Sequence, residues 1–393
     1  MELEVKRPEH IVPSYSLTGD LLSYLRCRLQ YRYHNGSALP PSRPVQLWFG
    51  EFLHGTLEMS YRFWADLRQK GQQPPDFPWP CTKREWRQDS PSWENHDIGK
   101  FADSVENALR QQGKQARSAD ARDSAYRRIE VAVNELGRHL FPLIDSTERK
   151  VIGTRPVPDS EKDLRCDNYE VHGVIDVLTN VTLSEASDDN LIRQYVQQVC
   201  PNLPETFEVI VDYKGARRPL TDEAYWEQGD WQVQTYAWLR ARQPDALQVA
   251  AGILIYINEL TPGGAEMQAI RRGLANDSTD VVPEAGSQDE QIVRMWREGM
   301  DTSQLSLAFR LRRAIRVIQI SSDSIERALS SFDDVVRQAE EDVVTESAGR
   351  DILQAWAPNC EDEATCAACD FRYFCPRPAG EPEDREIKAP TAP

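Results

Sequence analysis

Two short segments in the middle of the chain constrain its fold more than any other feature. They are residues 173–176 (GVID) and residues 209–215 (VIVDYKG). Each is an apolar, β-branched run that ends in an acid, a pattern typical of a buried strand. Residues two apart on a strand point to the same face, so we expect Asp212 and Lys214 to project into one site. Asp176 could join them there from a neighbouring strand.

Two carboxylates beside a lysine can hold a divalent metal, position a water and offset the charge of a phosphodiester transition state. An Asp-x-Lys pair at a strand end also occurs as a solvated turn, so the flanking sequence matters. Gln232 and Tyr236 lie four residues apart, on one face of a helical pattern. His54 lies among apolar residues of another helical pattern, where a lone histidine is often a core residue.

The order His, Asp, Asp-x-Lys, Gln-x-x-x-Tyr resembles that of the RecB-like branch of the PD-(D/E)XK nuclease superfamily. The resemblance extends over roughly residues 14–376. It implies an α/β fold with a restriction-endonuclease-like core, in which helices flank a mixed central sheet. It also implies an N-terminal helical region and a C-terminal segment clasped by an iron–sulfur cluster.

Carried over position by position, the family motifs assign a role to each of these residues. The implied metal ligands are His54, Asp176, Asp212 and the carbonyl of Tyr213. Lys214 would serve the attacking water, and Gln232 and Tyr236 would support the catalytic site. The expected metal is Mg²⁺ or Mn²⁺, and an imidazole ligand favours Mn²⁺. Glu58, one helical turn after His54, is a weaker candidate with an expected structural role.

The 8 cysteines are unevenly spread, and three of them, Cys366, Cys369 and Cys375, form a tight group. Thiolates at this spacing hold either zinc or an iron–sulfur cluster, and the spacing alone leaves both open. Disulfides are the alternative, but no signal peptide is visible and we expect an intracellular chain with reduced thiols.

The fourth ligand of this group is implied by the resemblance. In iron–sulfur members, which include CRISPR-adaptation nucleases and AddB-type subunits, an early cysteine joins three late ones to hold a [4Fe–4S] cluster. Cys27, in a basic and aromatic segment, matches that early cysteine. Cys360 is an alternative fourth ligand. We expect the cluster to be structural, and the isolated Cys81, Cys166 and Cys200 to be ordinary thiols.

The formal net charge of -17 is unusual for a protein that binds DNA, whose phosphates attract Lys and Arg. We expect each arginine cluster to be a solvated or salt-bridged face, although some of them could line a basic groove: residues 26–32, 217–218, 271–272 and 310–316. No apolar run approaches the roughly 20 residues that span a bilayer, so we expect a soluble, cytoplasmic protein that does not bind a membrane.

Four regions are expected along the chain: an N-terminal helical region with His54 and Cys27 (1–148), the nuclease core (149–260), a C-terminal strand and helix region with the cysteine group (261–375), and a disordered tail (376–393). Helices are expected at 16–35, 47–70, 101–145, 322–345 and from Thr221 onward. Strands are expected at 150–157, 169–179, 206–213, 251–257 and 314–320. Residues 71–100 and 273–288 are expected to be loops.

The expected function is that of a metal-dependent DNA nuclease, an exonuclease acting on single-stranded ends in repair, CRISPR adaptation or anti-phage defence. No phosphate-binding loop of the Gly-x-x-x-x-Gly-Lys-Ser/Thr type is present, so unwinding would need a partner such as a helicase. Three alternatives remain open: a non-catalytic DNA-binding or scaffold subunit of a larger complex, an iron–sulfur redox or sensor protein, and a nuclease whose substrate is RNA.

Overall fold

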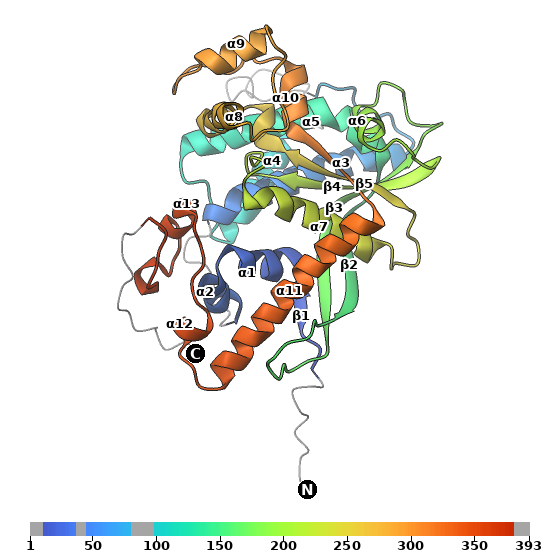
Figure 1. The fold of residues 1–393 in the computed structure, drawn as a ribbon. Coiled ribbons are helices and arrows are strands. Elements are labelled where there is room, and N and C mark those ends of the chain that lie inside the picture. The colour runs from blue at the N-terminus through green and yellow to red at the C-terminus, as the bar shows by residue number, and fades with distance from the viewer. Residues whose placement is uncertain (1–10, 37–44, 80–97, 381–393) are drawn as a thin grey trace.

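A mixed sheet of six strands forms the centre of the computed structural model, which describes residues 11–36, 45–79 and 98–380 (Figure 1). The strand order is β1–β3–β4–β5–β6, with β2 paired to β3 off this path. The β1–β3 and β4–β5 pairs are parallel, and the other pairs are antiparallel. The strands are β1 (Ser14–Ser16), β2 (Ile144–Pro156), β3 (Asn168–Thr182), β4 (Thr206–Lys214), β5 (Val249–Tyr256) and β6 (Ile315–Gln319).

Helices cover both faces of this sheet. One face packs against α3 (Val45–Gln69), α4 (Ile98–Gln111), α5 (Ala119–Leu140) and α6 (Leu191–Val199). The other face packs against α7 (Ala224–Arg240), the long α11 (Ser322–Ser347) and the N-terminal helices α1 (Leu22–Arg26) and α2 (Arg28–Tyr31) (Figure 1). This arrangement confirms the expected α/β architecture.

The remaining helical elements lie at the ends of these layers. They are α8 (Gly264–Asn276), α9 (Gln288–Met295), α10 (Leu307–Ala314), α12 (Ile352–Ala355) and α13 (Glu363–Ala367). Single helical turns are η1 (Leu17–Leu21), η2 (Arg32–Gly36), η5 (Phe141–Leu143), η6 (Ile257–Leu260) and η7 (Arg372–Phe374). In the part of the chain described here, no helix is both long enough and apolar enough to cross a membrane.

Helix α7 approaches the sheet closely because the strands beneath it carry glycines. There is one on each of three strands: Gly153 on β2, Gly173 on β3 and Gly252 on β5. A Cβ atom on Gly173 would lie 2.5 Å from the Tyr236 ring, and one on Gly252 would lie 2.7 Å from the Val233 Cβ. Glycine in a strand interior often marks such a close backbone approach. The three glycines therefore set the height of α7 above the strands.

The single helix expected over 101–145 is wrong. The segment forms α4 and α5, separated by a turn in which Gly113 adopts a left-handed φ of 78°. Ser118 then caps α5 by accepting a hydrogen bond from the Ala121 N–H. Strand β2 already begins at Ile144, so the expected strand at 150–157 covers only its second half.

Other boundaries also differ from the expectation. Helix α7 starts at Ala224 rather than near Thr221, and α8 and α9 occupy the two ends of the expected 273–288 loop. Strand β1 and helices α6, α8, α9 and α10 have no counterpart among the expected elements. Residues 80–97 of the expected 71–100 loop and residues 381–393 of the expected tail lie outside the described residues.

Substitution of Gly252 by alanine is expected to lower the free energy of unfolding by about 1–3 kcal/mol, because the new Cβ would overlap the Val233 side chain. Urea denaturation of both proteins measures the difference. Gly264→Ala is the control, since a Cβ there meets no atom within 4 Å at the start of α8. Equal stability of the Gly252→Ala variant and the wild type would contradict the proposed close approach of α7.

Candidate active site

Asp212 and Lys214 lie at the end of β4 and face α7. The strand alternates, with Val209 and Val211 in the core on the α3 side and Ile210 in the core on the α7 side. By the same alternation, the side chains of Asp212 and Lys214 project from the same face of the strand as Ile210, toward α7. The Lys214 Nζ lies 2.6 Å from an Asp212 carboxylate oxygen, and the Asp212 side chain is 6% exposed.

Gln232 on α7 bridges this ion pair. Its Nε2 donates to the other Asp212 carboxylate oxygen at 2.8 Å, and its Oε1 accepts from the Lys214 Nζ at 2.5 Å. Tyr236, one turn later, places its hydroxyl 3.4 Å from the Gln232 Nε2. The four residues thus form one hydrogen-bonded unit that joins the strand to the helix.

Burial and charge act in opposite directions on this pair. Burial raises the pKa of Asp212, and the negative charge of Asp176 adds to that rise although Lys214 opposes it. Burial would lower the pKa of Lys214, but the adjacent Asp212 carboxylate outweighs it and raises the pKa. Lys214 therefore carries a positive charge in this arrangement, and its ammonium is held in place by two acceptors.

Asp176 lies where β3 separates from β4. The last pair between these strands is Val177 with Val211. Beyond that pair, the backbone N–H of Tyr213 donates to the Asp176 carboxylate at 2.9 Å. The side chain thereby satisfies a backbone donor in β4 and is fixed beside the Asp212–Tyr213 peptide.

Glu148 on β2 completes a group with Asp176 and His54. One ligand-type atom from each of the three residues lies within 4.8 Å of the others, and among the described residues no other such group of histidine, cysteine or carboxylate side chains occurs. The β2–β3 register pairs Thr147 with Val177 and Arg149 with Ile175, so Glu148 lies opposite Asp176. Like charges directly opposite on paired strands repel each other.

The backbone of Glu148 is strained, since its φ of 52° falls in the left-handed region. For a residue other than glycine, asparagine or aspartate such a conformation is uncommon, and strain of this kind concentrates at functional sites. Burial and the negative charges of Asp176 and Glu58 raise the pKa of the Glu148 carboxyl. The fold therefore holds this carboxylate next to Asp176 at an energetic cost.

His54 supplies the opposite charge. Its Nδ1 lies 3.3 Å from an Asp176 carboxylate oxygen, and its ring contacts the Tyr213 ring edge-on. Burial lowers the pKa of this imidazole, but the hydrogen bond and charge of Asp176, with help from Asp212 and Glu148, raise it to about 9. One imidazole and two carboxylates are a donor set suited to a divalent metal ion.

A pocket between α3, β2, β3 and β4 opens onto this group. It is lined by His54, Leu57, Glu58, Tyr61, Ile144, Thr147, Glu148, Asp176, Val177 and Tyr213. The Glu58 carboxylate forms an ion pair with Arg62 and accepts a 3.5 Å hydrogen bond from the Thr147 hydroxyl. Its carboxylate is thus engaged with neighbours at the edge of the pocket.

The structure brings the sequence-predicted residues together in two adjoining groups. Asp212, Lys214, Gln232 and Tyr236 form one, and His54 and Asp176 belong to the other, with Tyr213 between them. Glu148 is the member that sequence reasoning missed. It lies among polar residues, with no hydrophobic alternation to mark it, and only the β2–β3 register reveals its place.

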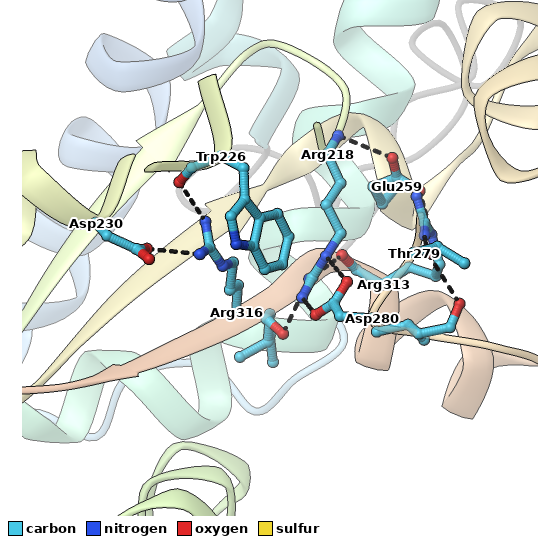
Figure 2. A network of polar contacts seen from close by, with 10 residues as sticks. Arg218, Trp226, Asp230, Glu259, Thr279, Asp280, Arg313 and Arg316 are labelled. Carbon is cyan, nitrogen blue, oxygen red and sulfur yellow. Dashed lines mark hydrogen bonds and ion pairs between the residues drawn. The ribbon is translucent and has the colours of Figure 1, made fainter. Parts of the chain in front are cut away.

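Most arginines that could have lined a groove instead form ion pairs, and three of these arginines are buried (Figure 2). The Arg218 guanidinium pairs with Asp280, and Arg313 pairs with Glu259 at 3.0 Å. Arg316 pairs with Asp230 at 2.6 Å and covers the face of the Trp226 ring. These pairs join Arg218, which follows β4, to Asp280 beyond α8, and they join α10 to η6 and β6 to α7. Buried charges of this kind are stable only when paired.

The cysteines of the two chain ends meet in a separate pocket beyond α11. The residues that line it include Cys27, Cys360, Cys366, Cys369 and Cys375. Three of them, Cys27, Cys366 and Cys375, are each 8% exposed. Cys166 and Cys200 are buried elsewhere, and Cys81 lies outside the described residues.

Comparison with known proteins supports this arrangement. A search of curated proteins found no match to the chain. A family model described as the PD-(D/E)XK nuclease superfamily matches residues 19–188 and 204–376, which contain Asp176, Asp212, Lys214 and the C-terminal cysteine group. The match extends over most of the sequence, and the chain therefore belongs to the PD-(D/E)XK nuclease superfamily.

Proposed function

We propose that this protein is a metal-dependent deoxyribonuclease that hydrolyses phosphodiester bonds. The observation that carries the proposal is the ammonium of Lys214, held by Asp212 and Gln232 next to a metal-suited group of His54, Glu148 and Asp176. Membership of a nuclease superfamily supports the same reaction class. The proposed ion is Mg²⁺ or Mn²⁺, bound by His54, Asp176, Asp212 and the carbonyl of Tyr213.

A bound divalent ion would lower the pKa of a coordinated water and polarise the scissile phosphate. The residues of the chain would do the rest. Lys214 would stabilise the negative charge that develops on the phosphate, because its ammonium is preorganised and needs little rearrangement. Gln232 and Tyr236 would hold that ammonium in position. Glu148 would join the ligands from β2, next to Asp176.

The proposed substrate is single-stranded DNA, cleaved from its ends. The resemblance to the RecB-like branch supports this finer assignment. RNA is the alternative substrate, which the cleavage assay described below also includes. The chain would act with protein partners such as a helicase or a defence or adaptation complex. A non-catalytic DNA-binding or scaffold subunit is the alternative function, and the complete set of catalytic side chains argues against it.

We further propose that the cysteine pocket holds a structural [4Fe–4S] cluster on Cys27, Cys366, Cys369 and Cys375. The resemblance to iron–sulfur members supports a cluster, as does the meeting of Cys27 with the three C-terminal cysteines in one pocket. A zinc ion is the alternative, which iron and sulfide analysis of the purified protein would distinguish. Arg372 and Arg377 also line the pocket and would offset the negative charge of a thiolate-bound cluster.

Replacement of Lys214 by alanine is expected to slow cleavage at least about 100-fold, because the variant loses the group that stabilises the developing charge. The assay uses end-labelled single- and double-stranded DNA and a matched RNA, with Mg²⁺ or Mn²⁺ and anaerobically purified protein. Lys70→Ala is the control, since this exposed lysine lies just after the end of α3 and, among the described residues, pairs with Asp66 of that helix. Cleavage by the Lys214→Ala variant at the wild-type rate would refute the proposed catalytic role.

Replacement of Glu148 by glutamine is expected to preserve or raise the stability of the metal-free protein but to weaken its binding of Mn²⁺. Without metal the variant should be at least as stable as the wild type, because the repulsion from Asp176 is removed. The variant should bind Mn²⁺ at least about tenfold more weakly than the wild type does, a loss of about 1.4 kcal/mol of binding free energy. Thermal unfolding over a Mn²⁺ titration measures both effects.

Glu58→Gln is the matched control for this experiment, because Glu58 lines the same pocket while its carboxylate pairs with Arg62. Its affinity for Mn²⁺ should stay within a few-fold of the wild-type value. An unchanged Mn²⁺ affinity of Glu148→Gln would remove Glu148 from the proposed ligands. A large loss of Mn²⁺ affinity in Glu58→Gln, but not in Glu148→Gln, would indicate that the ion binds nearer to α3.

A further inference from the structure

Five cysteines, rather than four, line the pocket at the C-terminal end of the described chain. A [4Fe–4S] cluster takes one thiolate for each iron, so one of the five sulfurs is surplus. We propose that Cys360 is a reserve sulfur donor, which binds the cluster in place of Cys366 when the Cys366 thiolate is lost. This inference rests on the cluster proposed above and adds a function for a cysteine outside the four ligands.

A single turn holds Cys360 and Cys366 together. The backbone carbonyl of Asp362 accepts a hydrogen bond from the Cys366 N–H at 3.0 Å and from the Cys360 thiol at 3.6 Å. The Asp362 carboxylate also accepts from the Thr365 N–H at 2.8 Å, which fixes the shape of the turn. Both cysteines therefore reach the pocket from the same short segment, and a small change in the turn exchanges one sulfur for the other.

The same segment is tied to the N-terminal cysteine. The backbone N–H of Arg28, the residue after Cys27, donates to the side chain of Asn359, the residue before Cys360, at 2.9 Å. Cys360 is therefore linked on one side to the segment of Cys27, through Asn359, and on the other side to the turn of Cys366, through Asp362.

Cys369 is anchored on another side of the pocket. Its sulfur accepts a hydrogen bond from the Gln30 Nε2 at 3.5 Å, and its backbone continues from the Cys366 turn toward η7. No shared hydrogen-bond acceptor joins it to Cys360 among the contacts of the described residues. Cys366, rather than Cys369, is therefore the ligand that Cys360 can replace.

The side chain of Cys360 is also placed to react. It is partly exposed, whereas Cys27 and Cys366 are each 8% exposed. The exchange transfers no electrons: the Cys360 thiol releases its proton to solvent, and its sulfur forms a bond to the iron that has lost the Cys366 sulfur. The cluster keeps four cysteine ligands and its oxidation state.

The test measures iron content, acid-labile sulfide content and visible absorbance of the full chain after anaerobic purification. It compares the wild type with four variants: Cys360→Ser, Cys366→Ser, Cys369→Ser and the Cys360→Ser/Cys366→Ser double variant. Cys360→Ser and Cys366→Ser should each keep most of the wild-type iron. Cys369→Ser and the double variant should lose it. Cys200→Ser is the matched control, because this buried cysteine only donates to the Ala250 carbonyl, which a serine can also do.

Alkylation followed by peptide mass spectrometry gives a second readout, whose wild-type arm does not depend on any variant folding. In the iron-loaded wild type, Cys360 should be modified while the other four pocket cysteines are protected. In Cys366→Ser, Cys360 should become protected. This pattern of protection reports ligation directly, whatever the activity of the protein.

Three results would overturn the inference, and they differ from failure of the proposed function. Loss of iron from Cys366→Ser as complete as from Cys369→Ser would show that Cys360 cannot substitute. Protection of Cys360 in the wild type, with loss of iron from Cys360→Ser, would make it a primary ligand. A wild type that contains neither iron nor sulfide would overturn the cluster itself, while the DNA cleavage assay would still test the nuclease.

Discussion

The amide of Gln232 is the contact on which the rest of the proposed active site depends. This amide offers a nitrogen donor to the Asp212 carboxylate and an oxygen acceptor to the Lys214 ammonium. A carboxylate there would repel Asp212, and an ammonium would repel Lys214. The contact requires α7 to lie within hydrogen-bond reach of β4, and the glycines beneath the helix permit that approach.

A second constraint brings the two ends of the described chain together. Helix α11 carries buried carboxylates that receive hydrogen bonds from the N-terminal segment: the Tyr15 hydroxyl donates to Glu340, and the Tyr24 hydroxyl donates to Asp342 at 2.7 Å. Arg32 pairs with Glu346 on the same helix at 2.7 Å. Since buried polar groups are stable only when satisfied, these contacts specify one docking of the N-terminal helices, which carries Cys27 toward the C-terminal cysteines.

The sequence allowed α3, α7, α11, several strands and the grouping of Asp212 with Lys214 to be predicted, because strong helical or β-branched periodicity marks each of them. The mixed order of the sheet was implied by the resemblance to the nuclease family, not by periodicity. Glu148 could not be predicted, since its position depends on the pairing of β2 with β3 and on an unusual backbone conformation. The arginine clusters were equally ambiguous. Arg218 finds its partner 62 residues away, at Asp280, and only the tertiary fold reveals that pairing.

Charge balance explains why the group of His54, Glu148 and Asp176 is suited to a cation. Two carboxylates face each other across paired strands, and the Lys214 ammonium is already engaged by Asp212. In the absence of a metal the raised pKa of His54, about 9, keeps a proton on its imidazole near neutral pH, and that single charge offsets part of the repulsion. A divalent ion would replace this proton with a larger charge, because a ligating imidazole must be neutral. A bound ion would favour the strained conformation of Glu148, because it would attract the carboxylate toward Asp176. In the metal-free protein the surrounding sheet must impose that conformation.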